Sequence, residues 1–167
     1  MNKDIDIIIY GATGFTGQLC VKYFQSLETK VSWAIAGRNL EKLKKVAQEN
    51  QTNVEILVAD ADDEIALDNL TSRAKVILSS AGPFHRYGSK LVASCVKNNC
   101  HYVDITGENF WVKGLIERHH AEASAKGLRI IPSCGFDSIP SDLGVFFAAK
   151  AIAKPIKRIE SFHSYQG

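Results

Sequence analysis

Gly11-Ala12-Thr13-Gly14-Phe15-Thr16-Gly17 is the stretch that decides the fold of this chain, because it compresses a strand end, a tight turn and a helix start. Gly11 allows the sharp turn, and Gly14 lets the backbone approach a pyrophosphate without a Cβ in the way. Gly17 lets the helix lie close to the strand. Backbone N–H groups at the helix start then point at the phosphates, so we predict a phosphate-binding turn over these residues.

The residues around the turn predict a sheet of parallel strands. Residues 5–10 are β-branched and almost wholly apolar, which is typical of a strand buried on both faces. Further strands are predicted at 31–37, 54–59, 75–80, 101–105 and 128–132, and helices at 15–27, 39–50, 63–72, 88–99, 110–126 and after Pro140. This alternation predicts an α/β, doubly wound Rossmann fold. We expect a mostly parallel six-stranded sheet of order 3-2-1-4-5-6 inside a three-layer αβα arrangement.

The pattern changes near the end of the chain. We expect residues 1–154 to form one dinucleotide-binding domain and residues 155–167 to begin a second, substrate-binding domain that is truncated. Residues 157–165 look like a strand that belongs to this other unit. The sequence is therefore interpreted as a piece of a longer protein.

Composition and charge exclude several classes of partner. The chain is 46% hydrophobic and carries 20 Lys and Arg against 18 Asp and Glu, a net charge too small and too mixed to favour nucleic acid. No apolar run is long enough to span a bilayer, and Asp4 and Asp6 interrupt any leader peptide, so we expect a cytoplasmic protein. The cysteines form no CxxC pair and have no histidine at ligand spacing, so no metal site is predicted; they are Cys20, Cys95, Cys100 and Cys134.

Arg38 indicates which dinucleotide the turn would hold. It follows the second predicted strand, near where an acidic residue would normally bind the ribose of NAD. Its planar guanidinium instead matches the adenosine 2′-phosphate of NADP, and Asn39 and Lys42 follow in the next helix. We therefore predict NADP(H) in preference to NAD(H). The alternative is that Arg38 only lies on the surface beside that helix.

Two further strand ends complete the predicted cofactor site. Asp60 follows the third strand, where it could accept a hydrogen bond from the adenine amine, whereas Asp62 and Asp63 could equally cap the next helix. The small residues Ser80-Ala81-Gly82-Pro83 follow the fourth strand, beside the switch point where ligands bind in such sheets. We expect the nicotinamide ribose to lie against them.

The sequence identifies no catalytic residue. Tyr87 and Lys90 invite comparison with the Tyr-x-x-x-Lys pair of short-chain dehydrogenases, but they are three positions apart rather than four, which favours an ordinary surface pair. Cys134 lies after the sixth predicted strand and could act as a thiolate nucleophile. A packed thiol is the alternative, since no partner base is evident.

Five stretches in order resemble the saccharopine dehydrogenase-like oxidoreductase family, and within it the trans-acting enoyl reductases of lipid biosynthesis. They are Gly11 to Gly17, Ala36-Gly37-Arg38-Asn39, Ser80-Ala81-Gly82-Pro83-Phe84, Tyr102-Val103-Asp104-Ile105-Thr106-Gly107-Glu108 and Cys134-Gly135-Phe136-Asp137-Ser138-Ile139-Pro140-Ser141-Asp142-Leu143-Gly144. The resemblance implies a nicotinamide cofactor on this domain and a second α/β domain that closes over the substrate. It also implies hydride transfer by the intact protein, with this piece alone inactive.

The position of these stretches indicates polar residues near the expected cleft. Asp104, Glu108 and Asp137 follow strands on the cofactor side, although none is assigned as acid or base. Asp137 is also well placed to cap the last helix, together with Ser138 and Ser141.

Three functions therefore compete. The first is an NADP(H)-dependent oxidoreductase whose intact form acts on a small or lipid-linked substrate. The second is a non-catalytic module that senses NADP(H), and the third is a semialdehyde dehydrogenase-like enzyme that uses Cys134. The sequence leaves a homodimer open.

Overall fold

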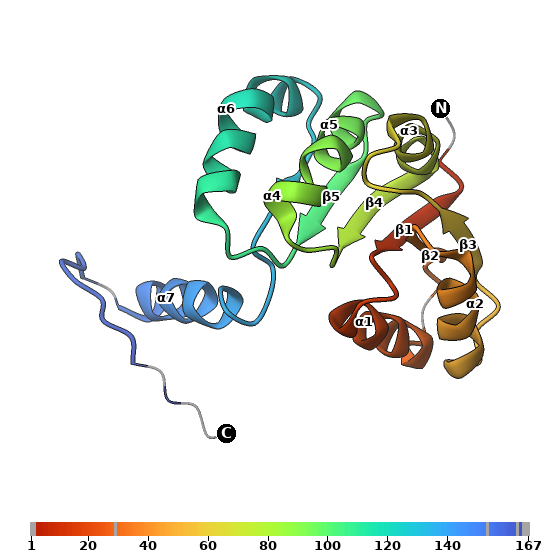
Figure 1. Cartoon of the computed structure of the whole chain (residues 1–167). Coiled ribbons are helices and arrows are strands. Elements are labelled where there is room, and N and C mark those ends of the chain that lie inside the picture. Colours follow the sequence, from red (N-terminus) through yellow and green to blue (C-terminus); the bar gives the residue numbers. More distant parts are fainter. Residues whose placement is uncertain (1–2, 29, 153, 163, 165–167) are drawn as a thin grey trace.

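A computed structural model describes residues 3–28, 30–152, 154–162 and 164. Its sheet has the order β3-β2-β1-β4-β5-β6, and every neighbouring pair of strands is parallel (Figure 1). The strands are β1 (Ile5–Tyr10), β2 (Trp33–Gly37), β3 (Glu55–Val58), β4 (Ala74–Ser79), β5 (His101–Asp104) and β6 (Ile130–Ile131). The predicted doubly wound fold and strand order are confirmed.

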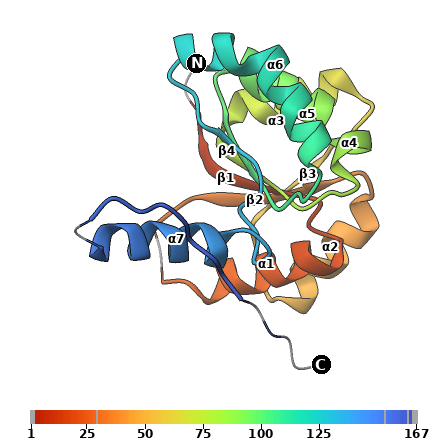
Figure 2. The ribbon, with the colours of Figure 1, turned by 90° about the vertical axis from the view of Figure 1, so that its left-hand side faces the viewer.

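Helices cover both faces of the sheet, which gives the predicted three layers (Figures 1 and 2). One face carries α1 (Phe15–Ser26) and α2 (Leu40–Glu49). The other carries α3 (Glu64–Arg73), α5 (Ser89–Lys97) and α6 (Asn109–Ala125). A short α4 (Phe84–Tyr87) precedes α5, and α7 (Ile139–Ala151) has no buried residue. None of the helices in the described ranges is long and apolar enough to cross a membrane.

The central strand β1 contributes side chains to two hydrophobic cores, one on each face of the sheet. Its consecutive residues Ile8 and Ile9 are both fully buried, but they point to opposite faces of the sheet. Ile8 packs with Ile77 and Tyr102 beneath α3, α5 and α6, whereas Ile9 packs with Ile35 beneath α1 and α2. The unbroken apolar run of β1 is therefore the pattern of a strand covered on both sides.

The structure corrects the sequence prediction at three elements. The helix predicted at 88–99 is preceded by the separate helix α4, and the strand predicted at 128–132 is reduced to Ile130–Ile131. The strand predicted at 157–165 is absent from residues 157–162 and 164, and its remaining positions lie outside the described residues. A strand needs a hydrogen-bonded neighbour, and β6, at the edge of the sheet, already pairs with β5 over only two positions.

The turn between β1 and α1 is packed too tightly for a side chain at Gly17. A Cβ atom there would lie 2.2 Å from the carbonyl oxygen of Gly11 and 2.8 Å from the Cα of Ala12. Both neighbours are backbone atoms and cannot move without displacing β1. The predicted role of Gly17 in close helix–strand packing is confirmed.

We expect Gly17→Ala to lower the free energy of unfolding by about 3 kcal/mol, because overpacking here must shift backbone rather than a side chain. Gly114→Ala is the matched control. Gly114 also lies inside a helix, but an added Cβ would meet only the flexible end of Arg118, at 3.5 Å. There the better helix propensity of alanine should stabilise the protein by up to about 1 kcal/mol. Urea denaturation of both variants measures the difference, and equal stability of the two would contradict the close packing.

Candidate functional site

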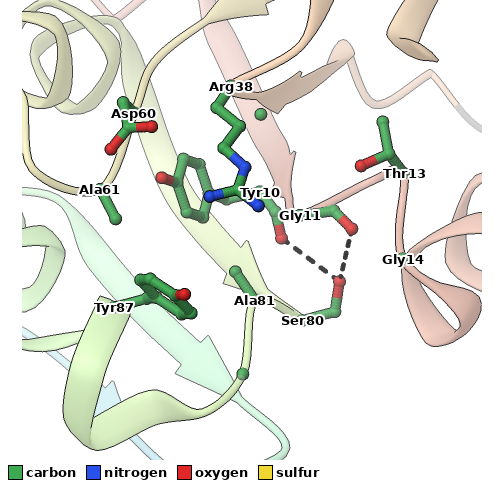
Figure 3. Close-up of a pocket in the computed structure, with 12 residues that line it drawn as sticks. Tyr10, Gly11, Thr13, Gly14, Arg38, Asp60, Ala61, Ser80, Ala81 and Tyr87 are labelled. Carbon is green, nitrogen blue, oxygen red and sulfur yellow. Dashed lines mark hydrogen bonds between the residues drawn. The ribbon is translucent and has the colours of Figure 1, made fainter.

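An open cavity of about 260 Å³ lies at the carboxyl ends of the strands (Figure 3). Ligands of doubly wound sheets bind at this edge, where the strand order reverses between β1 and β4. Residues from the ends of four strands and from α4 line the cavity: Tyr10, Gly11, Thr13, Gly14, Gly37, Arg38, Asp60, Ala61, Ser80, Ala81, Gly82 and Tyr87.

The glycine turn forms one wall of the cavity and presents a helix start to it. Gly11 has a φ of 84°, and a Cβ on it would lie 2.8 Å from the nitrogen of Ala81. The backbone N–H of Gly14 donates to the carbonyl of Gly11 at 3.0 Å. Helix α1 then begins at Phe15 with no side chain capping its first N–H groups. Those donors, together with the positive end of the helix dipole, suit a phosphate group.

The loop after β4 is fastened to this turn. The hydroxyl of Ser80 lies within hydrogen-bond distance of two carbonyl oxygens, those of Tyr10 at 3.3 Å and Gly11 at 3.2 Å (Figure 3). The backbone N–H of Ser80 also donates to the carbonyl of Tyr10, at 2.9 Å. The end of β4 and the glycine turn therefore form one continuous wall.

Arg38 extends into the cavity from the end of β2. Figure 3 shows its guanidinium beside the ring of Tyr10. Among the described residues, Arg38 takes part in no ion pair, so its charge is available to a bound anion. Arg38 therefore adds a positive charge to the lining of the cavity, and its side chain is also exposed to solvent.

Tyr10 is a buried residue that lines the cavity beside Arg38. Burial, and then the nearby carboxylate of Asp60, raise the pKa of Tyr10 to about 12. Its hydroxyl donates to the carbonyl of Ala59 at 3.3 Å. The phenol therefore stays neutral at physiological pH.

The acidic residues after β3 make different contacts and have different roles. Asp60 lines the cavity, as predicted, and its carboxylate accepts the backbone N–H of Asp62 at 2.9 Å. Asp63 is the N-cap of α3 and accepts the backbone N–H of Ala66 at 3.0 Å. Asp62 does not cap the helix but pairs with Lys90 at 3.3 Å. The capping alternative is thus confirmed for Asp63 alone.

Several predicted cofactor residues lie outside the cavity lining. The Asn39 side chain caps α2 by accepting the backbone N–H of Lys42 at 2.9 Å. Gly17 is buried behind the turn, and the ring of Phe15 is 82% exposed. Six residues predicted to bind the cofactor do not line the cavity: Phe15, Thr16, Gly17, Asn39, Lys42 and Pro83.

Tyr87 is the main lining residue that sequence reasoning missed. Its interpretation as half of an ordinary surface pair with Lys90 is wrong, because Tyr87 lines the cavity and Lys90 pairs with Asp62 and Glu64. The guanidinium carbon of Arg86 lies 5.3 Å from the centre of the Tyr87 ring. The absence of α4 from the prediction concealed this placement. The sequence also gave no signal for Tyr10, Gly37 or Ala61.

Asp104 is a buried structural residue and does not face the cavity. Its carboxylate accepts three hydrogen bonds of 2.9 Å, from the hydroxyl of Tyr102 and the backbone N–H groups of Thr106 and Ser133. Burial raises the pKa of Asp104 above the usual range even against these hydrogen bonds. Its position therefore corrects the expectation that it faces an active cleft.

Glu108 and Asp137 do not line the cavity either. Burial tends to raise the pKa of Glu108, but hydrogen bonds from His85 and Phe84 hold it below its usual value. Asp137 is exposed and stands before Ser138, the N-cap of α7, whose side chain makes no capping bond. The capping predicted for Ser138 is wrong.

Cys134 has the environment of an unreactive thiol. It is half-buried, and its sulfur donates to the carbonyl of Ile131 at 3.2 Å. Burial, and then the charge of Asp104, raise the pKa of the Cys134 thiol. These features favour the packed-thiol alternative over a nucleophile.

A parallel doubly wound sheet with this glycine turn at the switch point defines a dinucleotide-binding domain. The sequence model of the protein family described as saccharopine dehydrogenase NADP binding domain matches residues 7–131. The chain therefore belongs to the saccharopine dehydrogenase family, as its sequence motifs indicated, and its cofactor is NADP(H).

Curated relatives support this assignment, and a solved structure shares the fold. A trans-acting enoyl reductase of Mycobacterium leprae is 42% identical over 147 residues, which cover 86% of this chain and 35% of the relative. A lipid droplet localized protein of Caenorhabditis elegans is 35% identical over 166 residues, 94% of this chain and 39% of that protein. The saccharopine dehydrogenase (L-Glu forming) of Saccharomyces cerevisiae shares the fold, with a TM-score of 0.73 at 16% identity over 88% of this chain and 31% of that one. The chain thus spans well under half the length of these proteins.

We expect iodoacetamide to alkylate Cys134 at neutral pH more slowly than it alkylates a small free thiol, because a raised pKa leaves less thiolate. Cys20, whose pKa burial also raises, provides an internal reference. Mass spectrometry of the alkylated peptides over increasing pH measures both rates. Rapid, selective labelling of Cys134 at neutral pH would instead support the semialdehyde dehydrogenase-like function.

Proposed function

We propose that the cavity at the carboxyl ends of the strands binds NADP(H), with the adenosine 2′-phosphate on Arg38 and the pyrophosphate at the start of α1. The observation that carries this proposal is the guanidinium of Arg38, which enters the cavity without an ionic partner among the described residues. A charged hydrogen bond to the 2′-phosphate, worth about 1.5–3 kcal/mol, would favour NADP over NAD.

The proposed contacts follow the shape of the cavity. Asp60, Ala61 and Tyr87 surround the adenine end, where the carboxylate of Asp60 would accept from the adenine amine. The nicotinamide ribose lies against the loop after β4. The full proposed set keeps the sequence prediction and adds Ala61 and Tyr87: Gly11, Thr13, Gly14, Phe15, Thr16, Gly17, Arg38, Asn39, Lys42, Asp60, Ala61, Ser80, Ala81, Gly82, Pro83 and Tyr87.

The longer protein is proposed to transfer hydride between this cofactor and a small or lipid-linked substrate. Relatives that carry the name trans-acting enoyl reductase support this reaction class. The Tyr10 phenol, with a pKa of about 12, is a weak proton donor, and no catalytic residue is assigned among the described residues that line the cavity. We therefore propose that residues after 154 lead into a second domain that supplies the catalytic groups. Location of the protein in the cytoplasm and its assembly as a homodimer remain predictions.

Calorimetric titration of this chain with NADPH, NADP, NADH and NAD in turn tests the proposed site without a substrate. We expect NADPH and NADP to bind at least about tenfold more tightly than NADH and NAD, since only NADPH and NADP carry the 2′-phosphate that is proposed to bind Arg38. Binding by this chain combined with no NADPH oxidation by the full-length protein would favour a non-catalytic NADP(H) sensor. Failure of all four dinucleotides to bind would refute the proposed site.

We expect Arg38→Ala to weaken NADP binding by about ten- to a hundredfold and to leave NAD binding nearly unchanged, because only NADP carries the 2′-phosphate. Arg118→Ala is a suitable control, because Arg118 is an exposed arginine on α6 whose side chain donates to the carbonyl of Gly114 on the same helix. Titrations of both variants with both cofactors provide the comparison. Equal weakening of NADP and NAD by Arg38→Ala would contradict the assignment.

A further inference from the structure

The segment 80–88, here called the β4 arm, connects β4 to α5 and includes α4. It contributes four residues to the lining of the cavity, namely Ser80, Ala81, Gly82 and Tyr87. Its start is fastened to the glycine turn through Ser80, but the stretch from Gly82 to Tyr87 has no such bond to β1. The position of the Tyr87 ring therefore depends on what holds α4.

Glu108 holds the beginning of α4 from outside the cavity. One carboxylate oxygen accepts the backbone N–H of Phe84 at 2.8 Å. The other accepts the backbone N–H of His85 at 2.8 Å and lies 2.6 Å from the Nδ1 atom of the same histidine. A single side chain thus satisfies two of the N–H groups that begin this helix, and it does so with a negative charge, which strengthens each bond.

Glu108 is itself held rigidly. Its backbone N–H donates to the hydroxyl of Thr106 at 3.0 Å, and the backbone N–H of Thr106 donates to the buried carboxylate of Asp104 at 2.9 Å. Asp104 is the last residue of β5. The carboxylate that holds the β4 arm is therefore positioned from the neighbouring strand of the same sheet.

Trp111, in the first turn of α6, packs against both ends of α4. Its ring lies 5.9 Å from the ring of Phe84, the first residue of α4, and its indole N–H donates to the hydroxyl of Ser89 at 2.9 Å. A Cβ on Gly88 would lie 2.5 Å from the Trp111 ring. Trp111 thus holds α4 by packing, while Glu108 holds its first two backbone N–H groups by charged hydrogen bonds.

We propose that Glu108 is a positioning residue of the NADP(H) site, which holds the β4 arm so that Tyr87 and the loop after β4 face the cofactor. This inference rests on the proposed function of the cavity. Because the arm contacts the parts of the molecule that NADP and NAD share, loss of Glu108 weakens the binding of both cofactors by the same factor. In that respect it differs from Arg38, which acts on the 2′-phosphate alone.

Glu108→Gln tests the proposal, because glutamine keeps the shape of the side chain but loses the charge and one acceptor. We expect this substitution to raise the dissociation constants of NADPH and NADH alike by about tenfold. The matched control is Glu117→Gln, in which an exposed carboxylate on α6, the helix that Glu108 precedes, loses a 3.9 Å contact with Lys113. Binding by the control should equal that of the parent chain.

A double-mutant cycle with Tyr87→Ala separates positioning from general destabilisation. If Glu108 acts by placing Tyr87, then Glu108→Gln should have a clearly smaller effect on NADPH binding in the Tyr87→Ala background than in the parent. Fully additive effects would overturn the proposal. So would parental affinity in Glu108→Gln when the parent binds NADPH, whereas a parent chain that binds no dinucleotide would refute the proposed function itself.

Thermal melting of each unliganded variant shows whether it is folded. If Glu108→Gln does not fold, Glu108→Asp takes its place, because the shorter carboxylate keeps the charge but cannot reach both N–H groups at these distances. We expect it to fold and to bind both cofactors severalfold more weakly than the parent. Parental affinity in Glu108→Asp would overturn the positioning role.

Discussion

The peptide at Gly11 is the constraint on which the rest of the site depends. Its carbonyl oxygen accepts the backbone N–H of Gly14 and lies within reach of the Ser80 hydroxyl, and the Cα of Gly17 packs directly against it. One backbone group therefore fixes the start of α1 and the end of β4 relative to β1. Because both of these elements border the cavity, a small displacement of this peptide would move the proposed phosphate site and the proposed nicotinamide site together. The absence of side chains at the two glycines is the condition that lets three elements converge.

Charge is distributed unevenly around the cavity, and this gives the proposed cofactor an orientation. The positive end of the α1 dipole and the guanidinium of Arg38 lie on the side of β1 and β2, whereas Asp60 lies beyond β3. Between them, Tyr10 remains a neutral phenol, because burial and the Asp60 charge oppose its ionisation. A ligand with phosphates near the turn and a hydrogen-bond donor near Asp60 matches this arrangement, and the adenosine half of NADP has both features.

Most of the fold could be predicted from sequence because it depends on local patterns. Alternating strand and helix patterns predicted a doubly wound parallel sheet, whose usual strand order was adopted, and the spacing of Gly11, Gly14 and Gly17 identified the turn. The position of Arg38 one strand further on pointed to NADP, in agreement with the family assignment. Tyr87 and Glu108 could not be placed in this way, because their positions depend on contacts between α4 and the start of α6 that no periodicity encodes. The strand expected at 157–165 is absent from the described residues of that span for a related reason, since a strand pattern specifies a strand only where a neighbouring strand pairs with it.

The hydrogen bonds beneath the β4 arm extend beyond Glu108 to the loop that follows the edge strand β6. Asp104 accepts the backbone N–H of Ser133, and the Ser133 hydroxyl donates to the carbonyl of Thr106 at 2.8 Å. The segment between β6 and α7 is therefore bonded to the same loop that presents Glu108 to the arm. Each of these groups is at least partly buried, so an unpaired member would lose its hydrogen bond without full compensation from water. The loops after β4, β5 and β6 are thus held as one unit. This explains how Asp104 and Glu108, which do not line the proposed cofactor cavity, can still determine its shape.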